Sequence, residues 1–563
     1  MRVVVVGGVA GGMSFAARAR RLNESAEIIV LERGPYVSYA NCGLPYYVGG
    51  EITDRSKLLV QTPESLAASL NLDVRTGHEV TSVDASAKEV TLWTEAGEET
   101  LAYDYLVLSP GAKAVRPDIP GLEESTRLHT LRSVDDALTI RDIVETGVRR
   151  AVVLGAGFIG LETAEVLARE GLETTIVELA PHVLPTLDYE QAHFVEQELV
   201  RLGLDVRTGV AATEILPGVS AETVVLSDGA KIEADVIVLS VGVRPNTAFL
   251  DGSGVELERG AIVVDEYGRT SVPNIYAVGD ATVSTDPVTG VRRPVALAGP
   301  ANRAGRLVAD VLMRGEGHPI PEPLGTAIVR VGELTVAMTG ANRESLTTAG
   351  IGFHTLHLHP LDHAGYFPGA SQIHLVVHVR EGDGLILGAQ AVGASGVDKR
   401  IDVLATAVRT GMVIDELIDL DLSYSPPYGQ AKDAINLAGM VGSNVLDGTL
   451  KLWYAEDLDS VRDSSLILDT RGDAEVATGM VPGALHIPHT QLRERMDEVR
   501  EAAGDRPVRV MCASGVRSAI AHRILDQAGI DSASLSGGMI TLRAVLGDRA
   551  EALLVNGATA TGS

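Results

Sequence analysis

The chain has 563 residues, of which 45% are hydrophobic, and its 47 basic against 75 acidic side chains give a formal net charge of −28. A chain of this length and composition folds as several globular domains, and its negative charge argues against non-specific binding to nucleic acid or anionic membranes. No apolar run is long enough for a membrane span, and the opening MRVVVVGGVAGG reaches glycines too early for a signal peptide. We therefore expect a cytoplasmic multidomain protein.

The first segment has the pattern of a strand, a glycine turn, a helix and a second strand. An apolar run ends in glycines, a helical spacing follows over 13–22, and a second apolar run closes on Glu32. Such a unit binds a dinucleotide, because the glycines let the backbone approach a pyrophosphate at the helix N-terminus and the acidic residue binds a ribose. The glycines of this turn are Gly7, Gly8, Gly11 and Gly12.

The same pattern recurs in RAVVLGAGFIGLETAEVLAREGLETTIVELA, which contains G-x-G-x-x-G at Gly155, Gly157 and Gly160. Glu178 closes the second strand of this copy. Its carboxylate would repel the 2′-phosphate of NADPH, so we expect NADH, although arginines or His182 nearby could compensate and leave NADPH possible. Two complete units predict two dinucleotide sites.

Three later segments have the pattern of strands that end in turns: 103–121, 234–247 and 272–282. With the two glycine units, and in this order, they resemble the flavoprotein disulfide reductases that have two dinucleotide-binding domains, over roughly residues 1–445. The resemblance implies FAD at the first unit, NAD(P)H at the second, and a homodimer formed through the segment that follows. It places flavin contacts at Gly111, Gly279 and Asp280.

Cys42, in SYANCGLPYY, is one of only two cysteines. In the common disulfide reductases a second cysteine lies where this chain has Tyr47, so Cys42 must cycle through a mixed disulfide, a persulfide or a sulfenic acid. The segment resembles the single-cysteine branch, which contains coenzyme A-disulfide reductases, NADH oxidases and NADH peroxidases. The oxidases and peroxidases have a histidine where this chain has Ala10, which disfavours oxygen or peroxide as the acceptor.

The segment GGVAGGMSFAARARRL resembles the coenzyme A-disulfide reductases. Arg18 and Arg21 are three residues apart, so they would share one helix face suited to phosphates. Where the group can have a histidine, this chain has Asn302. The resemblance places coenzyme A contacts at Ser14, Arg18, Arg21, Ser38 and Asn41.

Two later motifs, HAGYFPGA and SYSPPYGQAKD, resemble the same group. The resemblance implies that Tyr366 and Tyr424 reach into the active site of the partner subunit and that Lys432 contacts coenzyme A. A tyrosine can donate a hydrogen bond to a thiolate or protonate a leaving sulfur. Tyr428, in the second motif, is an equally plausible candidate.

The second cysteine, Cys512, follows an apolar run and opens a helix, and with Arg517 it brackets a C-x-x-x-x-R loop. The loop amides and the arginine would surround one sulfur, lower the thiol pKa and stabilise a persulfide. Upstream, LILDTRGDAEVATGMVPGALHIP resembles the rhodanese signature. We therefore expect a rhodanese domain, and the retained cysteine argues against an inactive one.

Four histidines lie close together in HTLHLHPLDH: His354, His357, His359 and His363. Histidines this close together are typical of a metal site. The alternation of His357 and His359 equally suits a strand edge, however, and flavin chemistry needs no metal. We expect no metal here.

We thus expect an α/β protein with two Rossmann-like domains, an α+β dimerisation domain and an α/β rhodanese domain after a break near 439–448. The expected boundaries are 1–112 and 242–322 for FAD, 113–241 for NAD(P)H, 323–445 for dimerisation, 446–457 for a linker, 458–555 for rhodanese and 556–563 for a disordered tail.

The expected activity is reduction by NAD(P)H, through FAD and Cys42, of sulfur–sulfur bonds in coenzyme A persulfide, polysulfide or disulfide. Cys512 would carry sulfane sulfur as a persulfide. The sequence does not rank coenzyme A persulfide above glutathione persulfide or inorganic polysulfide. Two alternatives stay open: a rhodanese-type sulfurtransferase coupled to a flavin reductase, and an NADH oxidase.

Overall fold

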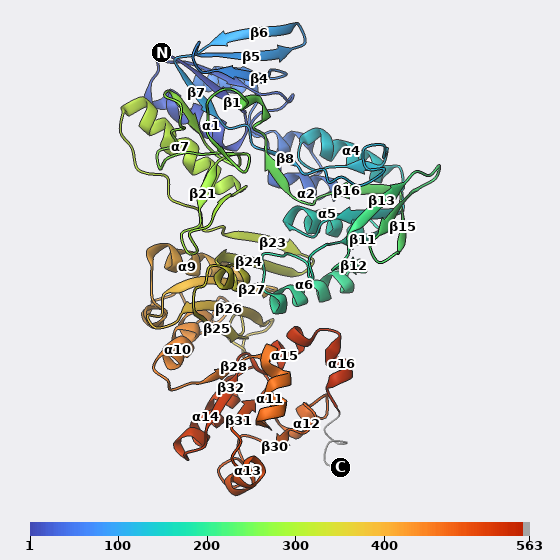
Figure 1. Cartoon of the computed structure of the whole chain (residues 1–563), viewed down its shortest axis with the longest axis vertical. Helices are drawn as coiled ribbons and strands as arrows, with labels where there is room; N and C mark the ends of the chain where they lie inside the picture. Colours follow the sequence, from blue (N-terminus) through green and yellow to red (C-terminus); the bar gives the residue numbers. More distant parts are fainter. Residues whose placement is uncertain (556–563) are drawn as a thin grey trace. The chain divides into compact units, whose positions relative to one another are not determined.

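The structure is a computed structural model that describes residues 1–555, so the predicted disordered tail lies outside the described residues. It divides into two compact units (Figure 1). Unit 1 comprises Met1–Pro181 and Leu202–Gly325, and unit 2 comprises His182–Arg201 and the chain from Thr326 onward. Within the described part, no helix has the length and apolar content needed to cross a membrane.

Unit 1 contains two parallel sheets, each built around a glycine turn. In the first sheet the order is β20-β7-β1-β2-β3. The four valines of its central strand are buried, which explains the unbroken valine run. Its elements are β1 (Arg2–Val6), α1 (Ala10–Leu22), β2 (Glu27–Leu31), β3 (Asp73–Arg75), β7 (Tyr105–Leu108) and β20 (Ile275–Ala277).

The second parallel sheet has the order β12-β11-β10-β16-β9. It repeats the arrangement of the first, with a helix directly after its central strand. Its elements are β9 (Leu128–His129), β10 (Arg150–Leu154), α5 (Phe158–Arg169), β11 (Glu173–Val177), β12 (Asp205–Arg207) and β16 (Val236–Leu239). The two dinucleotide-binding folds predicted from the glycine patterns are therefore confirmed.

Unit 2 begins with an antiparallel sheet of order β23-β24-β27-β26-β25. The helices α9 (Val397–Thr410) and α10 (Ala434–Leu446) pack on one face in a common apolar core, and α6 (Tyr189–Arg201) packs against the sheet as well. The strands are β23 (Ala327–Val331), β24 (Leu334–Gly340), β25 (Phe353–Leu358), β26 (Ile373–Arg380) and β27 (Ile386–Gly393).

Most of the break predicted near 439–448 falls on α10, which continues to Leu446, and the domain boundary itself stays a prediction. Its glycines permit close packing instead of ending the helix. A Cβ on Gly439 would lie 2.8 Å from the backbone nitrogen of Ile418, and one on Gly442 would overlap the side chain of Ile414.

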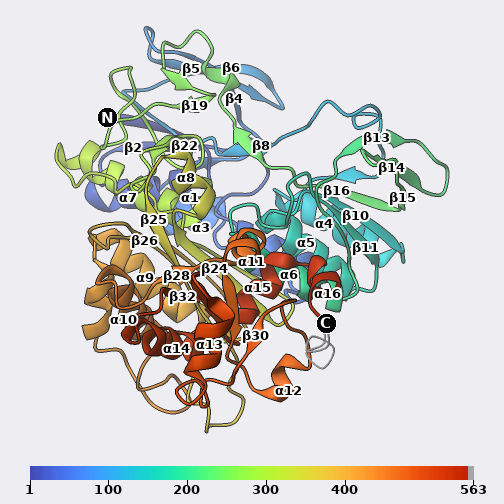
Figure 2. The same cartoon turned by 60° about the horizontal axis from the view of Figure 1, so that its bottom comes forward.

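The last part of unit 2 is a five-stranded parallel sheet of order β28-β32-β31-β29-β30, with apolar clusters that include helices on both faces (Figure 2). The first strand, β28 (Leu452–Trp453), lies within the segment predicted as a linker. The other main elements are α11 (Leu458–Ser464), β29 (Leu466–Asp469), β30 (Leu485–His486), α13 (Met496–Ala503), β31 (Val508–Met511), α14 (Val516–Gln527), β32 (Ser532–Leu535) and α15 (Gly538–Leu546).

Candidate active site

The glycine turn after β1 has the geometry of a pyrophosphate cradle. Gly7 adopts φ +101°, which favours glycine, and a Cβ on Gly12 would overlap the carbonyl oxygen of Gly7. Glu32, at the end of β2, accepts a hydrogen bond from the N–H of Gly8 at 2.8 Å. The turn, the helix and the carboxylate that a dinucleotide needs therefore lie together.

The turn after β10 reproduces this geometry. Gly155 adopts φ +100°, and a Cβ on Gly160 would overlap the carbonyl oxygen of Gly155. Glu178 accepts from the N–H of Ala156 at 2.6 Å and from the N–H of Ala180 at 2.8 Å. The predicted second site is thus built like the first.

The predicted flavin contacts lie after β7 and β20, which are neighbouring strands of the first sheet. Gly111 and Gly279 both adopt left-handed backbone, with φ +64° and +84°. Burial raises the pKa of the Asp280 carboxyl, and the charge of Arg132 opposes that shift. Asp280 is therefore a half-buried carboxyl next to a turn that only glycine adopts easily.

Cys42 lies in the turn η1 (Asn41–Gly43), directly before the helix α2 (Leu44–Val48), and it is exposed. The N–H of Ser38 donates to the carbonyl oxygen of Gly8 at 2.8 Å, and Ser38 adopts φ +48°. This contact attaches the cysteine segment to the first glycine turn, so the thiol stands beside the predicted flavin site.

Two carboxylates act on Cys42, one from each dinucleotide-binding domain. Burial first, and then the charges of Glu162 and Asp280, raise the pKa of the Cys42 thiol. Glu162 belongs to α5 and accepts a hydrogen bond from the Tyr46 hydroxyl at 3.0 Å. Glu162 was not predicted from the sequence; the available signal was its position two residues after Gly160.

The residues predicted to contact coenzyme A on α1 have partners on α7 (Ala298–Arg314). The hydroxyl of Ser14 donates to the side-chain oxygen of Asn302 at 2.5 Å. Arg18 donates twice to Asp310, at 2.6 and 3.0 Å. Arg21 is exposed. The two arginines therefore differ: the guanidinium of Arg18 is fixed by a carboxylate and that of Arg21 is open to solvent.

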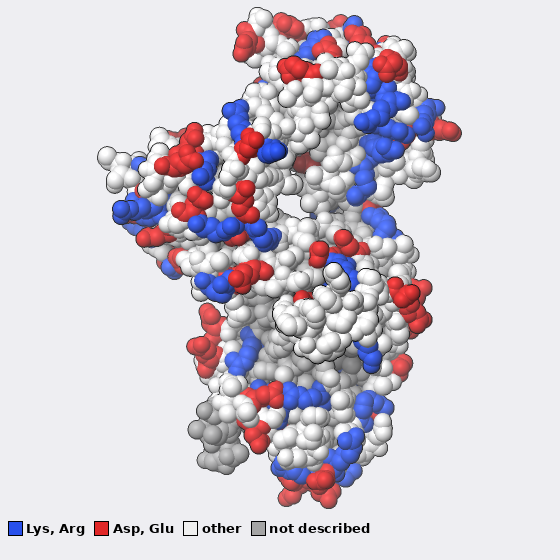
Figure 3. All heavy atoms as spheres, turned by 180° about the vertical axis from the view of Figure 1, so that it is seen from behind, with Lys and Arg blue, Asp and Glu red and all other residues white. Residues whose placement is uncertain are grey.

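Helix α7 adds two arginines that our sequence analysis missed. Arg303 and Arg306 are exposed, and within residues 1–555 neither has an ion pair. Arg306 lies one helical turn from both Asn302 and Asp310, so it is on the side of α7 that faces α1. In Figure 3, which shows the face opposite to that of Figure 1, Lys and Arg side chains gather along one edge of unit 1.

In unit 2, the structure brings Tyr366 and Tyr424 together, although they are 58 residues apart. Their hydroxyl oxygens lie 3.2 Å from each other, and the residues are 77% and 49% exposed. Tyr428 and Lys432 are exposed in the same segment of the chain. Such a pair of exposed hydroxyls can receive a proton and pass it on.

Cys512 follows β31 and precedes α14, as predicted. Its sulfur is buried, accepts a hydrogen bond from the N–H of Gly515 at 3.2 Å and lies 3.3 Å from the Ser518 hydroxyl. Gly515 adopts φ +94°. An amide aimed at the sulfur stabilises a thiolate or a persulfide anion.

Arg517 binds mainly to Glu475, which our sequence analysis missed. The two guanidinium nitrogens donate to the two carboxylate oxygens at 2.7 and 2.6 Å. This hydrogen-bonded pair lowers the pKa of Glu475 to about 2 and raises the pKa of Arg517, with a smaller contribution from Cys512. Glu475 thus holds the arginine of the C-x-x-x-x-R loop in place.

Comparisons with known proteins now identify the family. The pyridine nucleotide-disulphide oxidoreductase family matches residues 1–305, its dimerisation domain matches 326–434, and a rhodanese-like domain matches 451–541. The chain belongs to the pyridine nucleotide-disulphide oxidoreductase family. The predicted resemblance and the predicted architecture are confirmed, and the protein is an oxidoreductase. Membership of this family implies a flavin and a pyridine nucleotide as cofactors.

Three known proteins are similar to most of the chain. The coenzyme A disulfide reductase of Staphylococcus haemolyticus is 34% identical over 442 residues, which cover 78% of this chain and 98% of that protein. The structure of reduced Bacillus anthracis CoADR-RHD is 39% identical, covers 98% and 99% of the two chains and gives a TM-score of 0.95. An NAD-dependent persulfide reductase from A. fulgidus is 38% identical, covers 96% and 100% and gives 0.89.

Proposed function

We propose that this oxidoreductase uses NADH and FAD to reduce sulfur–sulfur bonds in coenzyme A persulfide, coenzyme A polysulfide and coenzyme A disulfide. The observation that carries the proposal is Cys42, an exposed thiol between the two dinucleotide-binding domains, in a chain whose one other cysteine is buried in the rhodanese domain. Cys42 has no neighbouring cysteine with which to form a redox disulfide, so its disulfide partner is the substrate. Relatives named for coenzyme A disulfide and persulfide reduction support this choice.

The two glycine turns fit the two cofactors. The Gly7–Gly12 turn would hold the FAD pyrophosphate, with Glu32 toward its ribose, and the Gly155–Gly160 turn would hold NADH. Glu178 favours NADH because its carboxylate would repel a 2′-phosphate. When bound, FAD would accept a hydride from NADH and return the electron pair to sulfur.

The Cys42 thiolate attacks the carbon-bound sulfur of coenzyme A persulfide and expels hydrosulfide, which leaves a mixed disulfide with coenzyme A. Two electrons from NADH then cleave this disulfide and release coenzyme A thiol and the Cys42 thiolate. The net reaction converts NADH, a proton and the persulfide into NAD⁺, hydrogen sulfide and the thiol. Tyr366 and Tyr424 of a partner subunit in a homodimer would donate the proton to the leaving sulfur.

The coenzyme A carrier would lie along α1 and α7. Its phosphates would meet Arg21, Arg303 and Arg306, whose guanidinium groups are open to solvent, while Arg18 is held by Asp310. Ser38 and Asn41 would contact the carrier near Cys42, and Lys432 would contact it from the partner subunit.

The rhodanese domain would carry sulfane sulfur as a persulfide on Cys512, stabilised by the N–H of Gly515. Thiol chemistry at Cys42 and Cys512 suits a reducing compartment, so we place the protein in the cytoplasm.

The decisive test is NADH consumption without oxygen, with coenzyme A disulfide, coenzyme A persulfide and glutathione persulfide offered separately. We expect turnover that Cys42→Ser abolishes and that Cys512→Ser leaves intact with small persulfides. If Cys512→Ser also abolishes it, the enzyme is a sulfurtransferase served by a flavin reductase. If NADH is consumed only after oxygen is admitted, the enzyme is an NADH oxidase and the proposal fails.

A further inference from the structure

The histidine-rich segment lies on one face of the sheet in unit 2. On β25, Leu356 and Leu358 belong to the apolar core. His357 and, directly after the strand, His359 point to the opposite face. On the neighbouring strand, His374 lies on the same face as His357 and His359. It stacks on Phe194 of α6 with ring centroids 3.7 Å apart.

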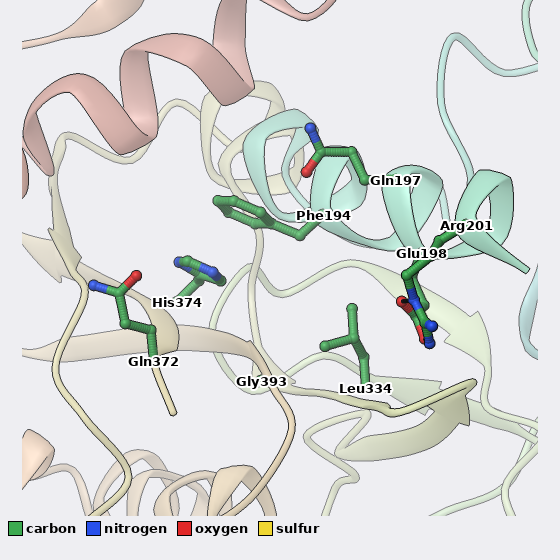
Figure 4. Close-up of a pocket in the computed structure, with 8 residues that line it drawn as sticks. All are labelled: Phe194, Gln197, Glu198, Arg201, Leu334, Gln372, His374 and Gly393. Atoms are coloured by element: carbon green, nitrogen blue, oxygen red, sulfur yellow. Dashed lines mark hydrogen bonds and ion pairs between the residues drawn. The ribbon is translucent and has the colours of Figure 1, made fainter. Parts of the chain in front are cut away.

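His374 and Phe194 line a pocket of about 310 Å³ (Figure 4). Within residues 1–555, no three His, Cys, Asp or Glu side chains are grouped to hold a metal ion.

His357 joins α6 to the rhodanese domain. Its Nε2 lies 2.8 Å from Oε1 of Glu190, and its Nδ1 lies 2.8 Å from the hydroxyl oxygen of Ser536. The backbone N–H of His357 also donates to that hydroxyl at 3.2 Å. Arg343 donates to the same Glu190 oxygen at 2.6 Å. The side chains of His357 and Glu190 are each 2% exposed, so these bonds are shielded from bulk solvent.

His359 makes a second, parallel connection. Its Nε2 lies 2.9 Å from the hydroxyl of Thr541, and its Nδ1 lies 2.9 Å from Nδ1 of His374. Ser536 lies in the turn that leads from β32 into α15, and Thr541 lies in the first turn of α15. In both Figure 1 and Figure 2, α15 lies beside α6. His357 on β25 and His359 directly after it therefore both hold a single rhodanese segment, 536–541.

This segment also holds the Cys512 loop. The N–H of Met539 donates to the carbonyl oxygen of Cys512 at 2.8 Å, and the N–H of Ile540 donates to that of Ala513 at 3.0 Å. A Cβ on Gly538 would lie 2.6 Å from the Cys512 carbonyl oxygen. A displacement of segment 536–541 would therefore move the backbone of Cys512.

We infer that His357 is a positioning residue for Cys512, which it acts on through Ser536 and segment 536–541. The backbone position of the Cys512 loop then depends on the dimerisation domain as well as on the rhodanese fold. The inference goes beyond the proposed reduction at Cys42 and rests on the proposed use of Cys512 as the sulfur carrier.

The test measures how fast iodoacetamide alkylates Cys512, as a function of pH, in the FAD-loaded full-length chain. A Cys42→Ser background leaves Cys512 as the one cysteine. Ser536→Ala deletes a single hydroxyl. His357→Gln keeps an amide near the Nε2 position and loses only the side-chain bond to Ser536. His357→Asn keeps an amide near the Nδ1 position. His354→Asn, on the same strand, is the matched control.

We expect Ser536→Ala and His357→Gln to raise the pH midpoint of alkylation by about one unit, hence to slow it about tenfold below that midpoint. His357→Asn and the control should stay within about twofold of the background. If neither Ser536→Ala nor His357→Gln moves the midpoint, or if His357→Asn behaves like His357→Gln, the inference is overturned. Alkylation needs no sulfur donor, so the result stands apart from any failure of the proposed function.

Discussion

Acid should weaken unit 2, and His374 allows the size of the effect to be worked out. Burial lowers the pKa of His374 from 6.5 to about 4, because its ring lies between Phe194 and His359. The folded chain therefore holds this ring neutral while the unfolded chain takes up a proton below pH 6.5. The contribution of His374 to stability is fully present above pH 6.5 and is lost as the pH falls from 6.5 to about 4.

The magnitude follows from the two pKa values. Between pH 7 and pH 5, a shift of this size costs about 2 kcal/mol of unfolding free energy from His374 alone. His359 acts in the same direction, since burial and then the charges of its histidine neighbours hold its pKa well below 6.5. His374→Phe keeps an aromatic ring against Phe194 and removes the titration, so its loss between the two pH values should be smaller by about 2 kcal/mol.

Tryptophan fluorescence can report the unfolding of unit 2, which contains both His374 and the rhodanese domain. The chain has two tryptophans: Trp93 is 58% exposed in unit 1, while Trp453 is buried and donates to the carbonyl oxygen of Val510 at 3.1 Å. In a Trp93→Phe background, urea unfolding at pH 7 and pH 5 then follows Trp453. Equal losses in the parent and in His374→Phe would refute the assignment of a neutral, buried His374.

Three further substitutions test a phosphate contact, a proton donor and a helix packing contact. Arg306→Ala should raise the KM for coenzyme A persulfide about tenfold by removing a charged phosphate contact, with no change for glutathione persulfide; equal effects in initial-rate assays would refute it. Tyr424→Phe removes the hydroxyl 3.2 Å from that of Tyr366, so kcat should fall by at least about tenfold with KM little changed, and an unchanged kcat would contradict the proton donor. Gly442→Val should cost about 2 kcal/mol in urea unfolding, because the side chain of Ile414 fills the space; a neutral variant would show that this packing can relax.

The sequence predicted the local backbone conformation of the glycine turns well. The turns at Gly7 and Gly155 need left-handed backbone and close approach, and both requirements are visible in the spacing of the glycines. Gly439 and Gly442 show the limit of predicting structure from glycine positions. The same residue type signals a break or a close helix contact, and only the position of Ile414 on another element decides between them.

Partners that are distant in the sequence could not be predicted. The spacing of Arg18 and Arg21 indicated a shared helix face, but Arg18 is bound to Asp310, 292 positions away. The alternation of the histidines correctly indicated a strand. The groups that cover His357 are Glu190 and Ser536, which are 167 and 179 positions away. Burial of a polar side chain depends on which elements meet, and local pattern does not contain that information.

The two cysteines lie in opposite environments, and the difference matches the two chemistries proposed for them. Cys42 is exposed, and partial burial of its sulfur first, and then the carboxylates Glu162 and Asp280, raise the pKa of its thiol. Cys512 is buried, and the N–H of Gly515 points at its sulfur, which suits a persulfide that must be shielded from stray thiols. A thiol that reacts with a large carrier has to be exposed to solvent. A thiol that stores sulfane sulfur has to be buried. Exchanging the environments would therefore disable both sites even though both sulfurs remained.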